Sequence, residues 1–430
     1  MELNARTSAS ESPASPAALM DRYTDVRGWT HRLAEPLSAE DMQVQSMPDA
    51  SPAKWHLAHT AWFFERFILR DQLGHDAIDD RYEFIFNSYY NAVGPQHSRP
   101  KRGLLSRPSV AEIFEYRATV DARMHDVLSG SVSNSIAGLV EVGLNHEQQH
   151  QELLLTDIKH ALGANPLKPA YLDDAAAFAC PEDEQHNAGT WLSFEGGLIE
   201  IGHDATKPGF AYDCETPRHT QYVNGFEIFD RLATNAEFAT FIDDGGYTRS
   251  DLWLDAGWSF VQQHQLDKPL YWNRKDDDAT EFTLAGQQPL DPDLPVCHIS
   301  LYEADAFARW KGCRLPTEAE WEHAAETVGA WGATMDDRVA RPTLACRDGM
   351  RQAFGECWEW TGTQFRPYPG FTAQPGALGE YNSKFMSDQF VLRGGSMATP
   401  RTHLRTTYRN FFPASARWQF TGVRLCRDLA

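Results

Sequence analysis

The stretch NHEQQHQE (residues 145–152) is the most informative one for the first third of this chain. It lies in an apolar run with helical periodicity, from about residue 135 to 162. His146 and His150 are four residues apart, so a helix places both imidazoles on one face, a turn apart, where they can share one metal ion. The segment WHLAH (residues 55–59) opens a second amphipathic run and offers a third imidazole. Three imidazoles would leave several coordination positions of a metal open, as oxygen activation or hydrolysis requires.

The sequence around these histidines predicts a helical domain. Helical periodicity extends from about residue 18 to 167 and favours a four-helix bundle, in which metal sites are built from inward-facing side chains. Capping-box patterns at Ser38 and Ser109 predict helix starts. Residues 81–106 form a Gly- and Pro-punctuated loop with aromatic residues, which is typical of a functional loop.

The pattern changes at about residue 190, and residues 190–430 predict an α+β domain. Glycines become frequent, helices become short and tryptophans are common. Helices are expected at 235–243, 301–310 and 317–326, the last with a capping box at Thr317. Residues 168–189 are polar and acidic and predict a linker, and residues 1–17 predict a disordered tail.

Composition excludes several functional classes. The chain has 430 residues, 42% of them hydrophobic, and a net charge of −21. The negative charge argues against nucleic acid, which needs clustered basic residues. No apolar run is long enough to span a membrane, and the first residues lack the apolar core of a signal peptide. The seven cysteines are scattered without a C-x-x-C pair, so we expect a reducing cytoplasm.

Two family resemblances cover nearly the whole chain beyond the tail. Residues 18–167 resemble the DinB-like helical bundle. Residues 190–430 resemble the formylglycine-generating-enzyme, or sulfatase-modifying-factor, fold, which is related to C-type lectin domains. The motifs that carry the second resemblance are FAYDCETPRH (210–219), TNAEF (234–238), RLPTEAEWE (314–322), WEW (358–360), LRGGS (392–396) and GVR (422–424).

The combination of both domains with WHLAH and His-x-x-x-His-x-Glu is similar to the ergothioneine-biosynthetic sulfoxide synthases, or hercynine oxygenases. The resemblance implies a non-haem Fe²⁺ enzyme. With dioxygen as co-substrate, it would join a thiol to the imidazole C2 of hercynine (trimethylhistidine) and oxidise the sulfur. The loop FNSYYNAVGP (86–95), followed by RPKRGLLSR (99–107), resembles the subgroup that uses free cysteine.

The resemblance implies that His59, His146 and His150 bind the iron. His59 is preferred to His56 because of the family match and not because of spacing, and His56 is expected to face elsewhere. Glu152 is expected either to orient an imidazole or to be a plain helix-surface carboxylate.

Further roles follow for the substrate side. The resemblance implies that one or both of Tyr89 and Tyr90 donate a proton, and a phenol with its ordinary pKa of about 10 is a competent general acid that does not ionise early. Gln149 matches a residue that the family uses near the imidazole substrate. The guanidinium groups of Arg99 and Arg102 have the geometry to bind the cysteine carboxylate.

The C-terminal domain is expected to line the same cleft with Asn410, Phe411 and Phe412, because aromatic faces bind a trimethylammonium group well. Trp418 is a weaker candidate of the same kind. The motifs RLPTEAEWE and WEW are expected to be mostly architectural. True formylglycine-generating enzymes bind copper with a cysteine pair in this domain, and no matching pair is evident, so only the fold is carried over.

The sequence also allows other functions. Glu147 makes the pattern His146-Glu147-x-x-His150 formally that of a zinc hydrolase with a glutamate base. A non-catalytic binding protein with structural histidines is a second rival. Within the family, γ-glutamylcysteine or a selenium donor could replace cysteine. Small-molecule substrates are the expected partners, with a monomer or a weak homo-oligomer as the expected state.

Overall fold

The computed structural model describes residues 16–172, 189–274, 279–344, 349–373 and 377–429. The chain divides into two compact units. The first, the helical unit, comprises Met1–Asn165, Ala205–Phe210 and Thr372–Lys384. The second, the α+β unit, comprises Pro166–Asp204, Ala211–Phe371 and Phe385–Ala430.

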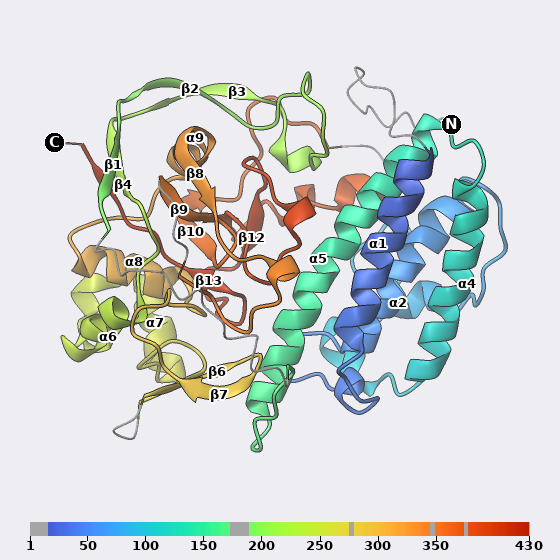
Figure 1. Cartoon of the computed structure of the whole chain (residues 1–430), viewed down its shortest axis with the longest axis horizontal. Helices are drawn as coiled ribbons and strands as arrows, with labels where there is room; N and C mark the ends of the chain where they lie inside the picture. Colours follow the sequence, from blue (N-terminus) through green and yellow to red (C-terminus); the bar gives the residue numbers. More distant parts are fainter. Residues whose placement is uncertain (1–15, 173–188, 275–278, 345–348, 374–376, 430) are drawn as a thin grey trace. The chain divides into compact units, whose positions relative to one another are not determined.

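Four long helices make up most of the described part of the helical unit (Figure 1). They are α1 (Pro16–Ala34), α2 (Ala53–Phe64), α4 (Val110–Leu128) and α5 (Asn134–Ala164). Helix α5 contacts α1 and α2, α2 contacts α4, and α4 contacts α1, so the four helices close around one core. The prediction of a four-helix bundle is confirmed. The shorter elements are η1 (Asp41–Gln43), the π-helical η2 (Glu65–Arg70), α3 (Tyr82–Phe86) and η3 (Arg99–Leu104).

The bundle core is apolar and comes from all four helices. Tyr23, Phe64, Val120 and Leu144 are fully buried in it. Burying such side chains stabilises the bundle by about 1.5–3 kcal/mol each. The helices are therefore held by their apolar faces, as the periodicity of the sequence predicts.

One of the two predicted helix starts in this unit is confirmed. The Ser109 hydroxyl accepts the N–H of Glu112, and the Glu112 carboxylate accepts the N–H of Ser109, at the start of α4. Ser38 and Asp41 make the same reciprocal contacts, but only the three-residue η1 follows them. Pro48 and Pro52 follow soon after, and the missing N–H and fixed φ of proline prevent a longer helix.

Short sheets characterise the α+β unit. A four-stranded sheet has the order β12-β11-β10-β13, antiparallel except for the parallel β10–β13 pair. Its strands are β10 (Trp358–Gln364), β11 (Phe390–Arg393), β12 (Asn410–Phe412) and β13 (Thr421–Gly422). An antiparallel sheet consists of β1 (Trp191–Phe194), β4 (Phe226–Phe229) and β14 (Cys426–Asp428). The smaller sheets pair β2 (Gly197–Ile201) with β3 (His219–Val223), β5 (Trp272–Asn273) and β7 (Gly286–Pro289) with β6 (Thr280–Thr283), and β8 (Gly329–Trp331) with β9 (Met350–Phe354).

The helices of this unit are α6 (Asn235–Asp243), α7 (Asp255–His264), α8 (Leu301–Trp310) and α9 (Glu318–Val328). Three of them are the helices that the sequence predicts, and Thr317 caps α9 as expected. Helix α7 was not predicted. The mixture of short helices and short strands confirms the α+β class.

The distinctive motifs of the α+β unit support its interior. Glu359, in the middle of WEW, is fully buried and accepts hydrogen bonds from the Trp321 indole and from Arg424. Arg314 donates to both oxygens of Glu320 in the first turn of α9. These contacts stabilise the fold of the unit, as expected for architectural residues.

Two expectations concern regions at the edge of the described chain. Residues 1–15 of the predicted tail and residues 173–188 of the predicted linker lie outside the described residues. Where the linker begins, the amides of Tyr171 and Leu172 both donate to the carbonyl of Leu284, at 2.7 and 2.9 Å. Among the helices that the structure describes, none has the length and apolarity to cross a membrane.

Candidate metal centre

The structure brings three of the predicted histidines together inside the helical unit. His59 comes from α2, and His146 and His150 come from α5. One nitrogen of each ring lies within 4.8 Å of the others, and all three side chains are buried. The Nε2 atoms of His59 and His146 are 3.1 Å apart. This is the arrangement that a shared metal ion needs.

The other nitrogens of two of these rings face neighbouring groups, which orients the rings. His59 Nδ1 lies 2.6 Å from the carbonyl oxygen of Phe86, and the ring stacks on Trp55 at 4.6 Å. His150 Nδ1 lies 2.8 Å from His56 Nδ1. The Nε2 atoms of both rings are thereby left for the centre of the cluster.

The expectation that His56 faces elsewhere is wrong. His56 is three residues before His59 on α2, and residues three apart are neighbours on a helix surface. Its ring is buried against His150, with the ring centroids 5.1 Å apart. His56 is not part of the three-ligand group, but it touches a member of it.

Burial keeps the three imidazoles neutral. Loss of solvation lowers the pKa of His146 to about 3, and burial together with the neighbouring histidines lowers the pKa of His59 and His150 well below the usual value. A metal-binding imidazole must be neutral, so the cluster is ready to donate lone pairs at neutral pH. Three neutral nitrogen donors suit a divalent transition metal such as Fe²⁺ or Zn²⁺.

Glu147 is held elsewhere in the bundle core. Its carboxylate accepts hydrogen bonds from Arg27 (2.8 Å), Arg117 (2.9 Å) and Thr30 (2.6 Å), and its side chain is fully buried. Burial alone would raise its pKa, but the charges of Arg27 and Arg117 outweigh burial and lower the pKa. A carboxylate committed to two arginines is a structural group, which argues against its use as a hydrolytic base. Glu152 is buried, so it is not a plain surface carboxylate.

The two predicted tyrosines lie on the loop between α3 and η3. The Tyr90 ring is fully buried and packs against Trp62 and Phe67. The Tyr89 hydroxyl is 3.4 Å from the Tyr90 hydroxyl, and the two rings are 4.6 Å apart. Burial raises the pKa of Tyr89, so this phenol stays protonated.

A third tyrosine, Tyr381, was not identified from the sequence. Its ring meets His146 edge-on at 5.7 Å and Tyr89 at 5.9 Å, and its hydroxyl donates to the side-chain oxygen of Gln149. The hydrogen bond places the predicted residue Gln149 beside the cluster. Tyr381 is 232 or more positions away in the chain from Gln149, His146 and Tyr89, and no spacing signal in the sequence connects them.

Contacts to the Tyr89–Tyr90 loop fix the segment that carries Tyr381. The Glu380 carboxylate accepts the N–H groups of Asn91 (3.0 Å) and Ala92 (2.8 Å). Lys384 donates to the Tyr89 carbonyl and lies over its ring. These bonds explain why Thr372–Lys384 belongs to the helical unit although it is distant in sequence.

The two predicted arginines differ in their surroundings. Arg102 is buried, its guanidinium lies 3.3 Å from the centre of the Trp55 ring, and it donates to the hydroxyls of Ser51 (2.8 Å) and Ser88 (3.1 Å). Burial, and then the charge of Arg99, lower the pKa of Arg102. Arg99 is exposed in η3.

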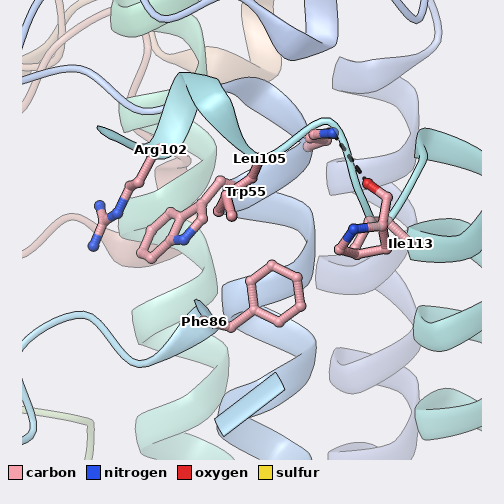
Figure 2. Close-up of a pocket in the computed structure, with 7 residues that line it drawn as sticks. Trp55, Phe86, Arg102, Leu105 and Ile113 are labelled. Atoms are coloured by element: carbon pink, nitrogen blue, oxygen red, sulfur yellow. Dashed lines mark hydrogen bonds between the residues drawn. The ribbon is translucent and has the colours of Figure 1, made fainter. Parts of the chain in front are cut away.

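Arg102 also lines a small pocket together with two residues that contact His59. Figure 2 shows Trp55, Phe86, Arg102, Leu105 and Ile113 around this pocket. Trp55 stacks on His59, and the Phe86 carbonyl contacts His59 Nδ1. Two walls of the pocket therefore belong to residues that hold a candidate ligand in place.

The predicted residues of the C-terminal domain lie in β12 of the α+β unit. Phe411 stacks on Phe365 with the ring centroids 4.1 Å apart, and Phe412 lies 6.1 Å from Trp418. The Asn410 side-chain oxygen accepts the N–H of Phe411. Their role in lining a substrate site stays a prediction.

Comparisons with known proteins define the class first. Residues 22–154 match the DinB superfamily, and residues 177–343 and 341–429 match the sulfatase-modifying factor enzyme 1-like domain. A formylglycine-generating enzyme from Streptomyces coelicolor is 32% identical over 35% of this chain and 51% of its own length. The fold prediction is therefore confirmed at the level of both domains.

Full-length relatives then define the family. The hercynine oxygenase of Mycolicibacterium thermoresistibile is 33% identical over 96% of this chain and 95% of its own length. The hercynine oxygenase of Mycolicibacterium smegmatis is also 33% identical, over 96% of this chain and 99% of its own length. The chain belongs to the hercynine oxygenase family, and the protein is an oxygenase, as the sequence predicts.

Proposed function

We propose that the protein is an iron(II)-dependent sulfoxide synthase that joins the sulfur of cysteine to C2 of the hercynine imidazole. Three buried neutral imidazoles on α2 and α5, in a chain of this family, are the observation that carries the proposal. The overall reaction consumes hercynine, cysteine and one O₂, and yields the sulfoxide and water. One oxygen atom enters the sulfoxide and the other leaves as water.

His59, His146 and His150 would hold the metal. Bound Fe²⁺ would supply the electron transfer that couples reduction of dioxygen to oxidation of the thiol. The protein contributes neutral donors that add no negative charge, so the site favours an anionic thiolate as an incoming group. The burial of the three rings also keeps bulk water away from this chemistry.

The polar groups beside His146 would bind substrate and deliver the proton. Gln149 and Tyr381 are hydrogen-bonded to each other next to the ring of His146. Tyr89 and Tyr90 form a pair of phenols, and the Tyr89 ring contacts the Tyr381 ring. Protonated phenols beside the cluster are competent general acids.

Arg102 and Arg99 would bind the carboxylate of the thiol substrate. Arg102 is a buried cation, and its hydrogen bonds among the described residues go to two serine hydroxyls. A buried guanidinium binds most strongly to a carboxylate, which it can hold through two parallel hydrogen bonds. Asn410, Phe411 and Phe412 would contribute to hercynine binding from the α+β unit.

Two further parts of the proposal concern the cell. The described cysteines are free, at positions 214, 297, 313, 357 and 426, which supports a reducing cytoplasmic location. We place the protein there as a monomer or weak homo-oligomer that acts on small molecules.

Oxygen uptake by the anaerobically iron-loaded protein tests the proposal. Hercynine is supplied with cysteine, γ-glutamylcysteine or a selenium donor, and the products are analysed by mass. With cysteine we expect oxygen uptake and a sulfoxide adduct. The His146→Ala variant should lose iron binding, oxygen uptake and the sulfoxide product. A preference for γ-glutamylcysteine would overturn the assigned donor, and full turnover by His146→Ala would overturn the ligand assignment.

A further inference from the structure

A line of side chains leads from His150 away from the candidate metal centre. His150 Nδ1 lies 2.8 Å from His56 Nδ1, and His56 Nε2 lies 3.1 Å from Oδ2 of Asp157. The same Asp157 oxygen accepts the N–H of Ser51 at 2.7 Å. All three side chains of the line are at least nine-tenths buried. The protein thus connects one candidate ligand to a fixed carboxylate through a second histidine.

The contacts determine where the protons lie. The Asp157 carboxylate only accepts, so the proton of neutral His56 is on Nε2 and the lone pair of His56 is on Nδ1. Two nitrogens 2.8 Å apart share one proton between them, so His150 carries its proton on Nδ1 and donates it to His56. His150 Nε2 then has its lone pair free for the cluster. Every N–H in the line points toward Asp157.

We infer that His56 and Asp157 are positioning residues that fix the tautomer and ring orientation of His150 for metal binding. The inference rests on the proposed function and extends it to residues outside the metal's own ligands. His59 is oriented by the backbone carbonyl of Phe86, which substitution cannot remove. His150 is oriented by side chains, so its support can be tested directly. Such outer partners affect metal affinity by about 10- to 100-fold.

Four substitutions separate this role from simple packing. His56→Ala and Asp157→Ala remove the line. His56→Gln keeps an oxygen that can accept from His150 and an amide that can donate to Asp157. Asp157→Asn keeps an oxygen that can accept from Ser51 and His56. His160→Gln is the matched control. It removes an imidazole that lies one turn after Asp157 on α5, and His160 Nδ1 is 2.7 Å from the Ser46 hydroxyl.

The measurement is the anaerobic dissociation constant for Fe²⁺, with Co²⁺ absorption as a second reading, alongside the melting temperature of each metal-free variant. We expect metal binding about 10- to 100-fold weaker in the two alanine variants, and within a few-fold of wild type in His56→Gln, Asp157→Asn and His160→Gln. If an alanine variant does not fold, the comparison of His56→Gln and Asp157→Asn with wild type still tests whether a hydrogen-bond acceptor at these positions is sufficient for normal metal affinity.

The outcomes are distinct. Wild-type affinity in His56→Ala would overturn the inference, and so would a loss in His56→Gln as large as that in His56→Ala, because packing alone would then explain both. A wild-type protein that binds neither metal would instead contradict the proposed function. The two failures are therefore told apart by the wild-type titration.

Discussion

At the scale of single residues, the candidate centre depends on contacts that orient each ring. The Phe86 carbonyl and Trp55 hold His59, and His56 holds His150. The i, i+4 spacing on α5 makes the pairing of His146 and His150 predictable from sequence. The prediction for His56 is wrong because His56 and His59 are three residues apart, and residues at this spacing are neighbours on a helix surface.

The tyrosines beside His146 give a prediction at this scale. Tyr381→Phe removes the hydrogen bond to Gln149 but keeps the ring against His146, so iron affinity should stay within a few-fold of wild type. Loss of a general acid should lower the rate of sulfoxide formation by about 10²-fold or more. Anaerobic iron titration and product analysis measure both quantities. An unchanged rate of sulfoxide formation would contradict the role of Tyr381.

Tyr90→Phe makes a companion prediction, because its phenol meets the Tyr89 hydroxyl and lies in the aromatic core. Iron should again bind, while the ratio of sulfoxide to oxidised cysteine should fall. Mass analysis of the products at equal iron content checks this. An identical product ratio would exclude Tyr90 from proton delivery.

At the scale of elements, the close approach of α5 and α2 sets the distance between the candidate ligands. Gly143 lies one turn before His146, and a Cβ atom placed there would lie 2.7 Å from the Phe64 ring and 2.9 Å from the Phe63 ring. Both phenylalanines are on α2 and fully buried. The glycine therefore permits the spacing that brings His59 to α5.

Gly143→Ala should destabilise the protein by about 1–3 kcal/mol, because overpacking forces the helices apart. Gly28→Ala on α1 is the matched control, since its Cβ would meet only the end of Arg32 at 3.6 Å. That change should stabilise the protein by about 0.5–1 kcal/mol through helix propensity. Denaturant unfolding of both variants measures the difference. Equal effects of both substitutions would contradict the close packing of α5 against α2 at Gly143.

Helices that begin with a capping box could be predicted from the sequence. Contacts between residues that are far apart in the chain could not. The capping boxes at Ser109 and Thr317 identified two helix starts. The residue before α7, Leu254, makes no side-chain cap, and only Gly257 and Val261 of this helix are buried, so its sequence signal is weak. Tyr381 is held beside His146 by its hydrogen bond to Gln149 and by the bonds of Glu380 and Lys384 to the loop that carries Tyr89. Such long-range contacts carry no periodicity in the sequence.

At the scale of the whole molecule, buried ion pairs hold the α+β unit together. Glu215 is fully buried and accepts from Arg405 (2.8 Å), Thr407 (2.7 Å) and the amide of Tyr212 (2.9 Å). Burial would raise its pKa, but Arg405 and these hydrogen bonds lower it below the usual value. The ion pair of Glu215 with Arg405 thus joins two segments that are 190 positions apart in the chain.

A lowered carboxylate pKa predicts a specific loss of stability in acid. The contribution of Glu215 should be fully present above its unfolded pKa of about 4.3 and disappear as pH falls through the lower folded pKa. Glu215→Gln should therefore melt well below wild type at pH 7, with the difference shrinking below about pH 4.3. Glu227→Gln breaks an exposed pair with Arg427 and should change little. A pH-independent difference for Glu215→Gln would contradict the assigned ionisation.

Reconstitution of the metal-free protein with Fe²⁺ or with Zn²⁺ tests the iron centre most directly. Oxygen consumption and sulfoxide are measured together with hercynine and cysteine present. We predict one O₂ consumed per sulfoxide formed with Fe²⁺ and none with Zn²⁺, and loss of both in His150→Ala. Sulfoxide formation by the zinc protein, or hydrolysis without oxygen that depends on Glu147, would contradict an iron oxygenase built on His59, His146 and His150.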